Sequence, residues 1–356
     1  MLIQHDKLRA VVRAICAAAG STGDEPAQVA DNLVYANLTG HDSHGVGMLP
    51  RYIACALSGT LKLNQHVKIV QDHGTMLVLD GQAGYGQVIG GEAMALGIER
   101  ARTHGVVVMA LRNSFHLCRI GAWAEQCAAE GMISMHYVNV IGHKPLVAPF
   151  RGADARYATN PYTCILPATD ANPTTLLDMA TSVVAMGKVR VAKNKGEAVK
   201  DGALIDSAGK PTTDPNVMYT PPFGAVLPFG EHKGYGMALM AEMLAGVLSG
   251  GQTMRPETIR TDDTIINNML TIVFDPRRLV GEDFYKAEVD ATIAHVKASP
   301  PQDPAEPVLV PGDPERATRA EREANGVPLD GATWEEILAA AESVGLTRGD
   351  IEGMAA

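Results

Sequence analysis

The segment TMLVLDGQAGYGQVIGGEAMALGIERARTHGVVVMALRNSF, residues 75–115, contains the pattern that determines the fold. Two short apolar runs, at 75–80 and 105–111, flank a stretch with helical spacing of apolar residues from about 88 to 103. The alternation continues through a helical stretch and two more apolar runs, at about 121–130, 132–139 and 162–167. Short strands that alternate with helices in this way predict an α/β layer.

The chain before this layer predicts helices. Apolar residues recur at helical spacing over 5–19 and 25–38, and Gly20 and Gly40 follow as stop signals. This helical pair leads into the polar segment GHDSHGVGMLPRY at 40–52.

The chain after the layer is mixed. It contains predicted strands at 176–180 and 268–274, and predicted helices from near Gly234 and at about 283–297. Six prolines within 299–314 exclude regular structure there and predict a strap on the surface. A last helix is predicted to begin at Thr333, whose spacing to Glu336 matches a capping box.

Composition narrows the class of protein. A chain of 356 residues predicts two packed lobes, and 46% hydrophobic with 20% charged residues is typical of a soluble protein. The net charge of −10 and the low aromatic content of 5% argue against nucleic-acid binding. The longest apolar stretch, Met237 to Val247, is interrupted by Glu242 and is too short for a membrane span.

The N-terminus and the cysteines predict the compartment. Charged residues interrupt the apolar stretch of the first 20 residues, so no signal peptide is expected. Five scattered cysteines without a C-x-x-C pair are typical of reduced thiols that pack in a core. We therefore expect a cytoplasmic protein that does not bind membranes.

Three glycines after the first predicted strand resemble a dinucleotide-binding loop. Gly84, Gly86 and Gly90 have the spacing G-x-G-x-x-x-G, which differs from the Rossmann fingerprint. The next strand also runs into Arg112 instead of an acidic residue that could bind a ribose hydroxyl. A tight structural turn is the favoured interpretation.

The segment His41-Asp42-Ser43-His44 gathers four polar side chains after a helix. One interpretation makes His41 and His44 metal ligands, with His116 or a carboxylate as a third. A second makes His44 a general acid/base whose tautomer is set by a neighbour such as Ser43. A third has these residues cap the helix and pack. Gly45 and Gly47 leave room beside the imidazole and favour a functional site.

A second polar cluster covers residues 113–119, at the carboxyl end of a predicted strand, where α/β sheets collect ligands. His116 and Arg119 are three residues apart, so a helical turn would place an acid/base beside an anion anchor. The alternative is a solvated loop that begins a helix.

Several motifs together resemble the malate/L-lactate dehydrogenase family of the non-Rossmann type. They occur in the family's order and spacing over about residues 5–345: DSHGVGMLPRY, RNSFHLCRIGAWAEQ, ATNPYTCILP, LLDMATSVVAMGKV, LPFGEHKGYGMALMAEMLAGVLSGG and VPGDP. GHDSHGVGM and HLCRIGAWAEQ point to the hydroxycarboxylate dehydrogenase B-like branch.

The resemblance implies an NAD(P)-dependent oxidoreductase of 2-oxo or 2-hydroxy acids, and some relatives reduce cyclic imines instead. It implies a homodimer and a mixed α+β fold, in which a non-Rossmann NAD(P)-binding α/β domain is inserted into a lobe of N- and C-terminal helices. Residues 1–75 and about 235–356 are then expected in the mainly helical lobe, and about 76–234 in the α/β domain.

The same resemblance implies roles for individual residues. His44 matches the general acid/base, with Ser43 beside it, and His116 matches a second acid/base candidate. Asp178 matches an acid that supports catalysis or lines the cofactor pocket. The resemblance places two substrate contacts in the ATNPYTCILP motif, at Thr159 and Asn160. The implied cofactor contacts are Thr174, Thr175, Leu176, Leu177, Asp178, Met179, Ala180, His232, Lys233, Gly312, Asp313 and Pro314. Lys233 precedes a helix start, where an ammonium and backbone donors favour a phosphate.

One position departs from the family pattern. Many relatives carry an arginine where this chain has Met48, so the substrate carboxylate must be held otherwise. Arg119 and Arg51 are the available guanidinium groups, and we expect Arg119 to anchor it. Met48 and Phe115 would then leave a roomier apolar wall for a larger substrate side chain.

The choice of cofactor and two rival functions stay open at this point. The basic run Lys188, Arg190, Lys193 and Lys195 could bind the 2′-phosphate of NADP, but such runs are more often solvated, which favours NAD. The rivals are a metal-dependent hydrolase built on His41, His44 and His116, and an inactive binding protein with the same fold.

Overall fold

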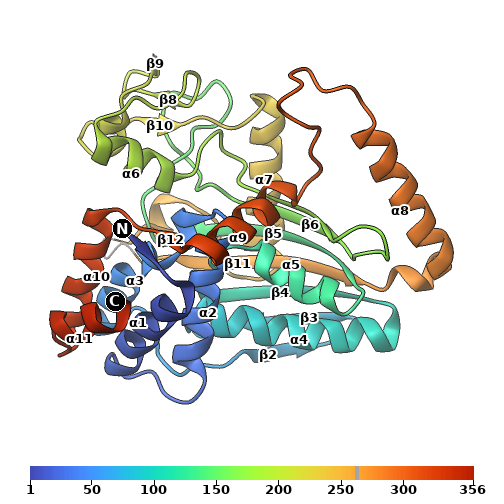
Figure 1. Cartoon of the computed structure of the whole chain (residues 1–356), viewed down its shortest axis with the longest axis horizontal. Helices are drawn as coiled ribbons and strands as arrows, with labels where there is room; N and C mark the ends of the chain where they lie inside the picture. The colour runs from blue at the N-terminus through green and yellow to red at the C-terminus, as the bar shows by residue number, and fades with distance from the viewer. Residues whose placement is uncertain (261–263) are drawn as a thin grey trace.

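A central seven-stranded sheet organises the molecule (Figure 1). The computed structural model describes residues 1–260 and 264–356. Across the sheet the strands lie in the order β2 (Lys68–Asp72), β3 (Met76–Asp80), β4 (Val106–Phe115), β11 (Ile266–Phe274), β5 (Ile133–Ile141), β6 (Tyr162–Leu166) and β7 (Thr175–Met179). β3 and β4 are parallel, whereas the other described neighbours in this sheet are antiparallel. The predicted α/β class is confirmed, and the sheet is not the parallel sheet of a Rossmann fold.

The strand–helix–strand unit predicted at 75–115 forms as β3, α4 (Gly86–His104) and β4. The glycines that open α4 permit close packing: a Cβ on Gly86 would lie 2.1 Å from the carbonyl oxygen of His116, and one on Gly90 would lie 2.6 Å from the ring of Trp123. These contacts confirm the interpretation of the glycine loop as a structural turn.

Helices cover both faces of the sheet. Val138 of β5 packs in one hydrophobic cluster with Trp123 and Cys127 of α5 (Gly121–Ala129). The next residue, Asn139, bonds instead to Glu242 of α7 (His232–Gly246). Because consecutive strand residues point to opposite faces, α4 and α5 cover one face of the sheet and α7 covers the other.

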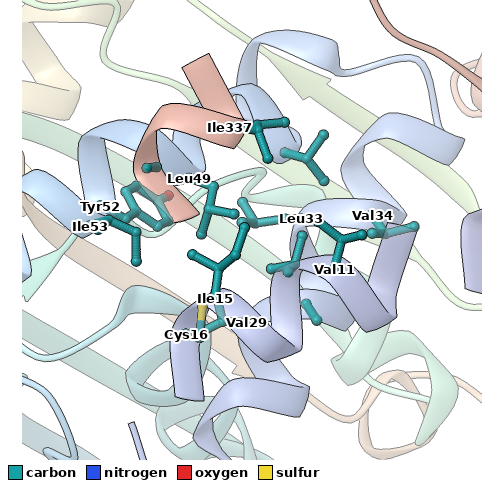
Figure 2. Packing of buried hydrophobic residues seen from close by; sticks show 14 of the residues in the cluster. Val11, Ile15, Cys16, Val29, Leu33, Val34, Leu49, Tyr52, Ile53 and Ile337 are labelled. Atoms are coloured by element: carbon teal, nitrogen blue, oxygen red, sulfur yellow. The ribbon is translucent and has the colours of Figure 1, made fainter. Parts of the chain in front are cut away.

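The N- and C-terminal helices build a second core together. It contains α1 (His5–Ala18), α2 (Glu25–Leu38), α3 (Leu49–Ser58), α10 (Gly331–Ser343) and α11 (Arg348–Ala355). Figure 2 shows side chains of this cluster, among them Ile15, Leu33 and Leu49 from the N-terminal helices and Ile337 from α10. β1 (Leu2–Ile3) pairs with β12 (Val327–Pro328) and ties the two ends of the chain together.

The expected boundary near residue 235 needs correction. β11 belongs to the C-terminal part of the chain, yet it lies in the sheet between β4 and β5. α7 packs on β5 and β11, so it also belongs to the sheet layer. The reason is that the apolar side chains of Met269, Leu270 and Val273 are buried where hydrogen-bonded strands flank β11 on both sides.

Smaller elements surround these two layers. A three-stranded sheet of β8 (Leu204–Ile205), β9 (Pro211–Thr212) and β10 (Ala225–Val226) accompanies α6 (Met186–Lys195). α8 (Glu282–Lys297) precedes the proline-rich strap, which leads into α9 (Asp313–Asn325). Sequence patterns did not predict α9 or α11. No helix in the described ranges is long and apolar enough to cross a membrane.

The capping box predicted at Thr333 is wrong. α10 begins two residues earlier, and the Oδ1 atom of Asp330 accepts a hydrogen bond from the backbone N–H of Thr333 at 2.8 Å. Aspartate at this position satisfies an N–H group that the helix leaves unpaired, so the cap is Asp330.

Candidate active site

The turn that carries His44 consists of two short 3₁₀ segments, Asp42–His44 and Val46–Met48, between α2 and α3. Asn37, which is 1% exposed, holds the turn from the last part of α2. Its Oδ1 accepts from the backbone N–H of Val46 at 2.8 Å, and its Nδ2 donates to Asp42 at 2.7 Å. A Cβ on Gly45 would lie 2.2 Å from the Asn37 amide oxygen. Gly45 is therefore needed to make room for the Asn37 side chain. The sequence had suggested instead that it leaves room beside the imidazole.

α9 holds the same turn from the other end of the chain. Arg322 donates to both carboxylate oxygens of Asp42, at 2.6 and 3.0 Å. The Nε2 atom of His41 lies 3.5 Å from a carboxylate oxygen of Glu315. His41 thus pairs with α9, and among the described residues no group of three His, Cys, Asp or Glu side chains could hold a metal ion. The metal-hydrolase interpretation finds no support in this arrangement.

The structure brings His44 and His116 together. Their rings stack with centroids 5.5 Å apart and planes 20° from parallel. His116 follows the end of β4, and Asn267 of β11 fixes its loop by accepting from the backbone N–H of Leu117 at 2.7 Å. Two segments 72 residues apart in sequence (116 − 44) therefore form one site.

Both imidazoles are neutral at pH 7. Burial lowers the pKa of His44 to about 4, with His41 and Arg119 acting in the same direction and Asp178 opposing them. Burial also lowers the pKa of His116 well below its usual value, and the charge of Arg51 and any protonation of His44 or His143 act in the same direction. Neutral imidazole can accept a proton, as a general base must.

A side-chain hydroxyl lies within hydrogen-bond distance of the Nδ1 atom of each ring. The Ser43 hydroxyl lies 3.0 Å from Nδ1 of His44, and the Tyr52 hydroxyl lies 2.6 Å from Nδ1 of His116. Gln87 in turn donates from Nε2 to the Tyr52 oxygen at 3.2 Å. These contacts orient both rings, and within residues 1–260 and 264–356 no hydrogen bond involves the Nε2 atom of either ring.

Arg119 does not lie where the sequence-based hypothesis requires it. The helical turn that would place it beside His116 does not form, because Cys118 adopts φ +63°. The Arg119 side chain is 2% exposed and donates to both oxygens of Glu125, at 2.9 and 3.1 Å. Its Nε lies 3.4 Å from Asp178. A guanidinium held by two carboxylates is a structural clamp, and this placement argues against Arg119 as the substrate anchor.

Asp178 of β7 is the centre of that clamp. It accepts from the Thr163 hydroxyl at 2.7 Å and from the backbone N–H of Gly121 at 2.9 Å, at the start of α5. A carboxylate there pairs well with the positive end of the helix dipole. Asp178 therefore connects β6, β7 and α5, and its charge also acts on His44.

The other residues predicted to contact the substrate lie in two different environments. Arg51 in α3 lies close enough to lower the pKa of His116 by its charge. Asn160 is completely buried and donates to Glu242 at 2.7 Å and to the carbonyl of Ala238 at 3.1 Å. The carbonyl of Thr159 accepts from the backbone N–H and hydroxyl of Thr181, both at 2.9 Å. These bonds support the scaffold beneath the site.

The proposed apolar wall also needs correction. Phe115 is fully buried, with its ring 5.4 Å from that of Tyr52 in an edge-to-face contact. It packs in the helical core and does not line a substrate pocket. Met48 is half-buried and packs against hydrophobic clusters on two sides.

The segments implied in cofactor binding converge on β7, an edge strand of the sheet. The N–H of Leu176 donates to the carbonyl of Pro311 at 3.2 Å, which seats the Gly312 turn beside this strand. The N–H of Phe229 donates to the carbonyl of Thr181 at 3.0 Å, which brings the start of α7 close to the other end. His232 and the exposed Lys233 lie in the first turn of α7.

These segments offer suitable chemistry for a dinucleotide. An ammonium group and a helix N-terminus suit a pyrophosphate, and an edge strand offers peptide groups. Beside β7 a cavity of about 250 Å³ is lined by Glu125, Thr174, Gly312 and Glu315, among others. Asp313 is not available there, since Lys297, Arg316 and the N–H of Val310 occupy its carboxylate.

Sequence reasoning missed several residues of the site. They share a buried or half-buried position and bond to a histidine, to its loop or to the Tyr52 hydroxyl: Asn37, Tyr52, Gln87, Asn267 and Arg322. Tyr52 and Asn37 stand next to predicted site residues, but nothing in their spacing shows which side chain they contact. A polar residue at a buried helix position is the one signal that could have identified Asn37.

Comparisons with known proteins identify the family of the chain. The family model described as malate/L-lactate dehydrogenase matches residues 3–338. The chain is 48% identical to hydroxycarboxylate dehydrogenase B of Escherichia coli K12 over 95% of this chain and 93% of the relative. It is 38% identical to L-lactate dehydrogenase of Cupriavidus necator over 97% and 98% of the two chains. The solved structure of sulfolactate dehydrogenase from Methanocaldococcus jannaschii superposes with a TM-score of 0.84 at 31% identity, covering 98% and 99%.

Proposed function

Since the chain belongs to the malate/L-lactate dehydrogenase family and is an oxidoreductase of 2-hydroxy acids, we propose that His44 exchanges the substrate's proton in this reaction. The observation that carries the proposal is the pair of stacked, neutral imidazoles, His44 and His116, with a cationic Arg51 nearby. The substrate is a 2-oxo or 2-hydroxy carboxylic acid, and when bound the nicotinamide supplies or accepts the hydride.

His44 suits proton exchange because its ring is neutral in the free protein. As a neutral base it takes the hydroxyl proton of a 2-hydroxy acid at Nε2 while Ser43 holds Nδ1. In the reverse direction His44 must first be protonated. An anionic substrate beside the ring favours the imidazolium, so we expect the pKa of His44 to rise when the 2-oxo acid binds.

Arg51 replaces Arg119 as the proposed carboxylate anchor. Its positive charge acts on His116, and we propose that its guanidinium reaches a ligand that contacts the histidines. Two parallel N–H donors suit a carboxylate. Arg119 keeps the proposed role of fixing α5 against β7 through Glu125 and Asp178.

We propose NAD as the cofactor, held by Thr174–Ala180, His232, Lys233 and the turn Gly312–Pro314. The cavity beside β7 is lined by two carboxylates, Glu125 and Glu315, and by two arginines, of which Arg316 already pairs with Asp313 and Arg319 with Glu323. The basic run lies on α6 instead, where Lys193 sits over the ring of Tyr219 and Arg190 lies 3.9 Å from Glu336.

We also propose that the protein is a homodimer and lies in the cytoplasm. Apolar side chains on and just after α7 are exposed by about half, as a subunit interface would require: Met240, Met243, Val247 and Leu248. The five cysteines form no disulfide, which fits a reducing compartment. Light scattering of the purified protein measures the mass, and a monomer at micromolar concentration would contradict the dimer.

A panel of 2-oxo acids and a cyclic imino acid, each assayed with NADH and with NADPH, tests the function. We expect turnover of 2-oxo acids with NADH and a kcat/KM at least tenfold lower with NADPH. Turnover of the cyclic imine alone would replace the substrate class with the imine reduction that the family resemblance also implies. Absence of any nucleotide-dependent turnover would reject the function.

A further inference from the structure

A chain of three side chains ends on His116. Gln87 donates from Nε2 to the Tyr52 oxygen at 3.2 Å, and that hydroxyl lies 2.6 Å from Nδ1 of His116. Gln87 is 3% exposed and Tyr52 is fully buried, so these groups depend on one another for hydrogen bonds.

The chemistry of these groups fixes the direction of the bonds. An amide nitrogen can only donate, so the Tyr52 oxygen accepts from Gln87. The single hydroxyl hydrogen of Tyr52 then goes to its other partner, Nδ1 of His116. A proton on Nδ1 would oppose that hydrogen and leave one of them buried without an acceptor. Since neutral imidazole carries one proton, the remaining proton of His116 is on Nε2.

The surroundings hold this chain in place. Tyr52 belongs to the helical core (Figure 2), where its ring makes edge contacts with Tyr85 and Phe115 at centroid distances of 5.9 and 5.4 Å. Gln87 lies in the first turn of α4, directly after Gly86, which touches the backbone of His116. Both residues are therefore attached to the loop that they orient.

We propose that Tyr52 and Gln87 are positioning residues that keep His116 in the Nε2–H tautomer, so that His116 donates a hydrogen bond to the substrate oxygen. This inference rests on the proposed function and deepens it. It divides the work between the two rings: His116 polarises the carbonyl group or binds the developing oxyanion, and His44 transfers the proton.

Nitrogen-15 NMR of the histidine rings in the full-length protein tests the tautomer directly. The signal of His116 is identified by its loss in His116→Gln among the 11 histidines of the chain. We expect an unprotonated Nδ1 and a protonated Nε2 in the wild type at pH 8. A protonated Nδ1 would overturn the proposal.

Gln87→Glu is the sharpest variant, because it keeps the shape and replaces the donor by an acceptor. At pH 8 the carboxylate would take the Tyr52 hydrogen, and the Tyr52 oxygen would then accept from Nδ1–H of His116. We expect the ring signal to switch to the Nδ1–H tautomer and kcat/KM for the 2-oxo acid to fall about 100-fold. An unchanged tautomer with normal kinetics would overturn the proposal.

Tyr52→Phe and Tyr85→Phe form a matched pair. Both delete one buried hydroxyl from the same cluster, but among the described residues no hydrogen bond joins the Tyr85 hydroxyl to His116 or its loop. We expect Tyr52→Phe to lower kcat/KM about tenfold and Tyr85→Phe to change it less than twofold. Equal losses in both variants would show a purely structural role. The NMR experiment needs no substrate, so an inactive wild type would reject the proposed function and still leave the tautomer measurable.

Discussion

The two histidines sit on supports of different kinds. The turn of His44 is held by the buried amide of Asn37 and by charged groups of α9, with Arg322 on Asp42 and Glu315 on His41. The loop of His116 is held from the sheet side and the core by neutral groups, Asn267, Tyr52 and Gln87. The His44 turn therefore depends on partly exposed ion pairs in addition to one buried amide, whereas the His116 loop depends on neutral buried groups, two amides and a hydroxyl.

The largest expected effect separates the two rings. We expect His44→Gln to lower kcat/KM for the 2-oxo acid by about 10³-fold, within the usual range for loss of a general acid or base. His116→Gln should cost less, about 10²-fold, because only a hydrogen-bond donor is lost. Steady-state kinetics measures both. A near-normal rate for His44→Gln with a collapse for His116→Gln would reverse the assigned roles.

The next effect concerns the two arginines. Arg51→Met should lower kcat/KM about 10²-fold, chiefly through KM, because the substrate carboxylate loses its partner. Arg119→Met should instead lower the free energy of unfolding by about 3 kcal/mol, since Glu125 and the largely buried Asp178 lose their cation. Kinetics and urea unfolding of both variants decide between them. The assignment fails if Arg119→Met abolishes substrate binding at unchanged stability.

A smaller effect is expected at the charged support of His44. Arg322→Met removes the two bonds to Asp42, and we expect kcat/KM to fall about tenfold while the His116 loop keeps its geometry. Glu321→Gln is the control, because Glu321 lies on the same helix and accepts a hydrogen bond from the exposed Asn325. It should change kcat/KM less than twofold. Equal effects of both variants would show that α9 matters only for general stability.

The smallest effect is expected for the pH dependence of the oxidation reaction. The oxidation of the 2-hydroxy acid needs neutral His44, and burial lowers the pKa of that ring to about 4. The base is therefore already deprotonated throughout pH 5.5–8, so kcat/KM for oxidation should change less than threefold in that range. For reduction the protonated ring is needed, so kcat/KM should fall as pH rises. A rising limb for oxidation centred at pH 6.5 would show an unperturbed histidine and contradict the enclosed site.

Much of the fold could be predicted, because it depends on local periodicity. Predicted helices at 5–19 and 25–38 form as His5–Ala18 and Glu25–Leu38, and β3, α4 and β4 follow the predicted order. The position of β11 in the sheet could not be predicted, because the sequence of an apolar strand does not specify which strands pair with it. α9 was missed because its residues are mostly charged and expose no apolar stripe.

Prediction of the site failed where a side chain's partner decides its role. The motifs around His44 and His116 identified both rings, but the spacing from His116 to Arg119 suggested a shared face that Cys118 at φ +63° prevents. Arg119 also pairs with the carboxylates of Glu125 and Asp178, which are 6 and 59 residues away in sequence (125 − 119 and 178 − 119). This placement favours a structural role for Arg119 over substrate binding, because a buried guanidinium must pair with an anion that the fold brings near it.

The sequence by itself determined the α/β class, the elements around residues 75–167, the two histidine motifs and the family to which they point. The tertiary structure decided that the ends of the chain share a core, that the rings stack 5.5 Å apart, and that Tyr52 faces Nδ1 of His116. The physical reason is that hydrophobic periodicity is a local property, whereas burial, pKa and hydrogen-bond direction depend on groups that meet only when the chain has folded.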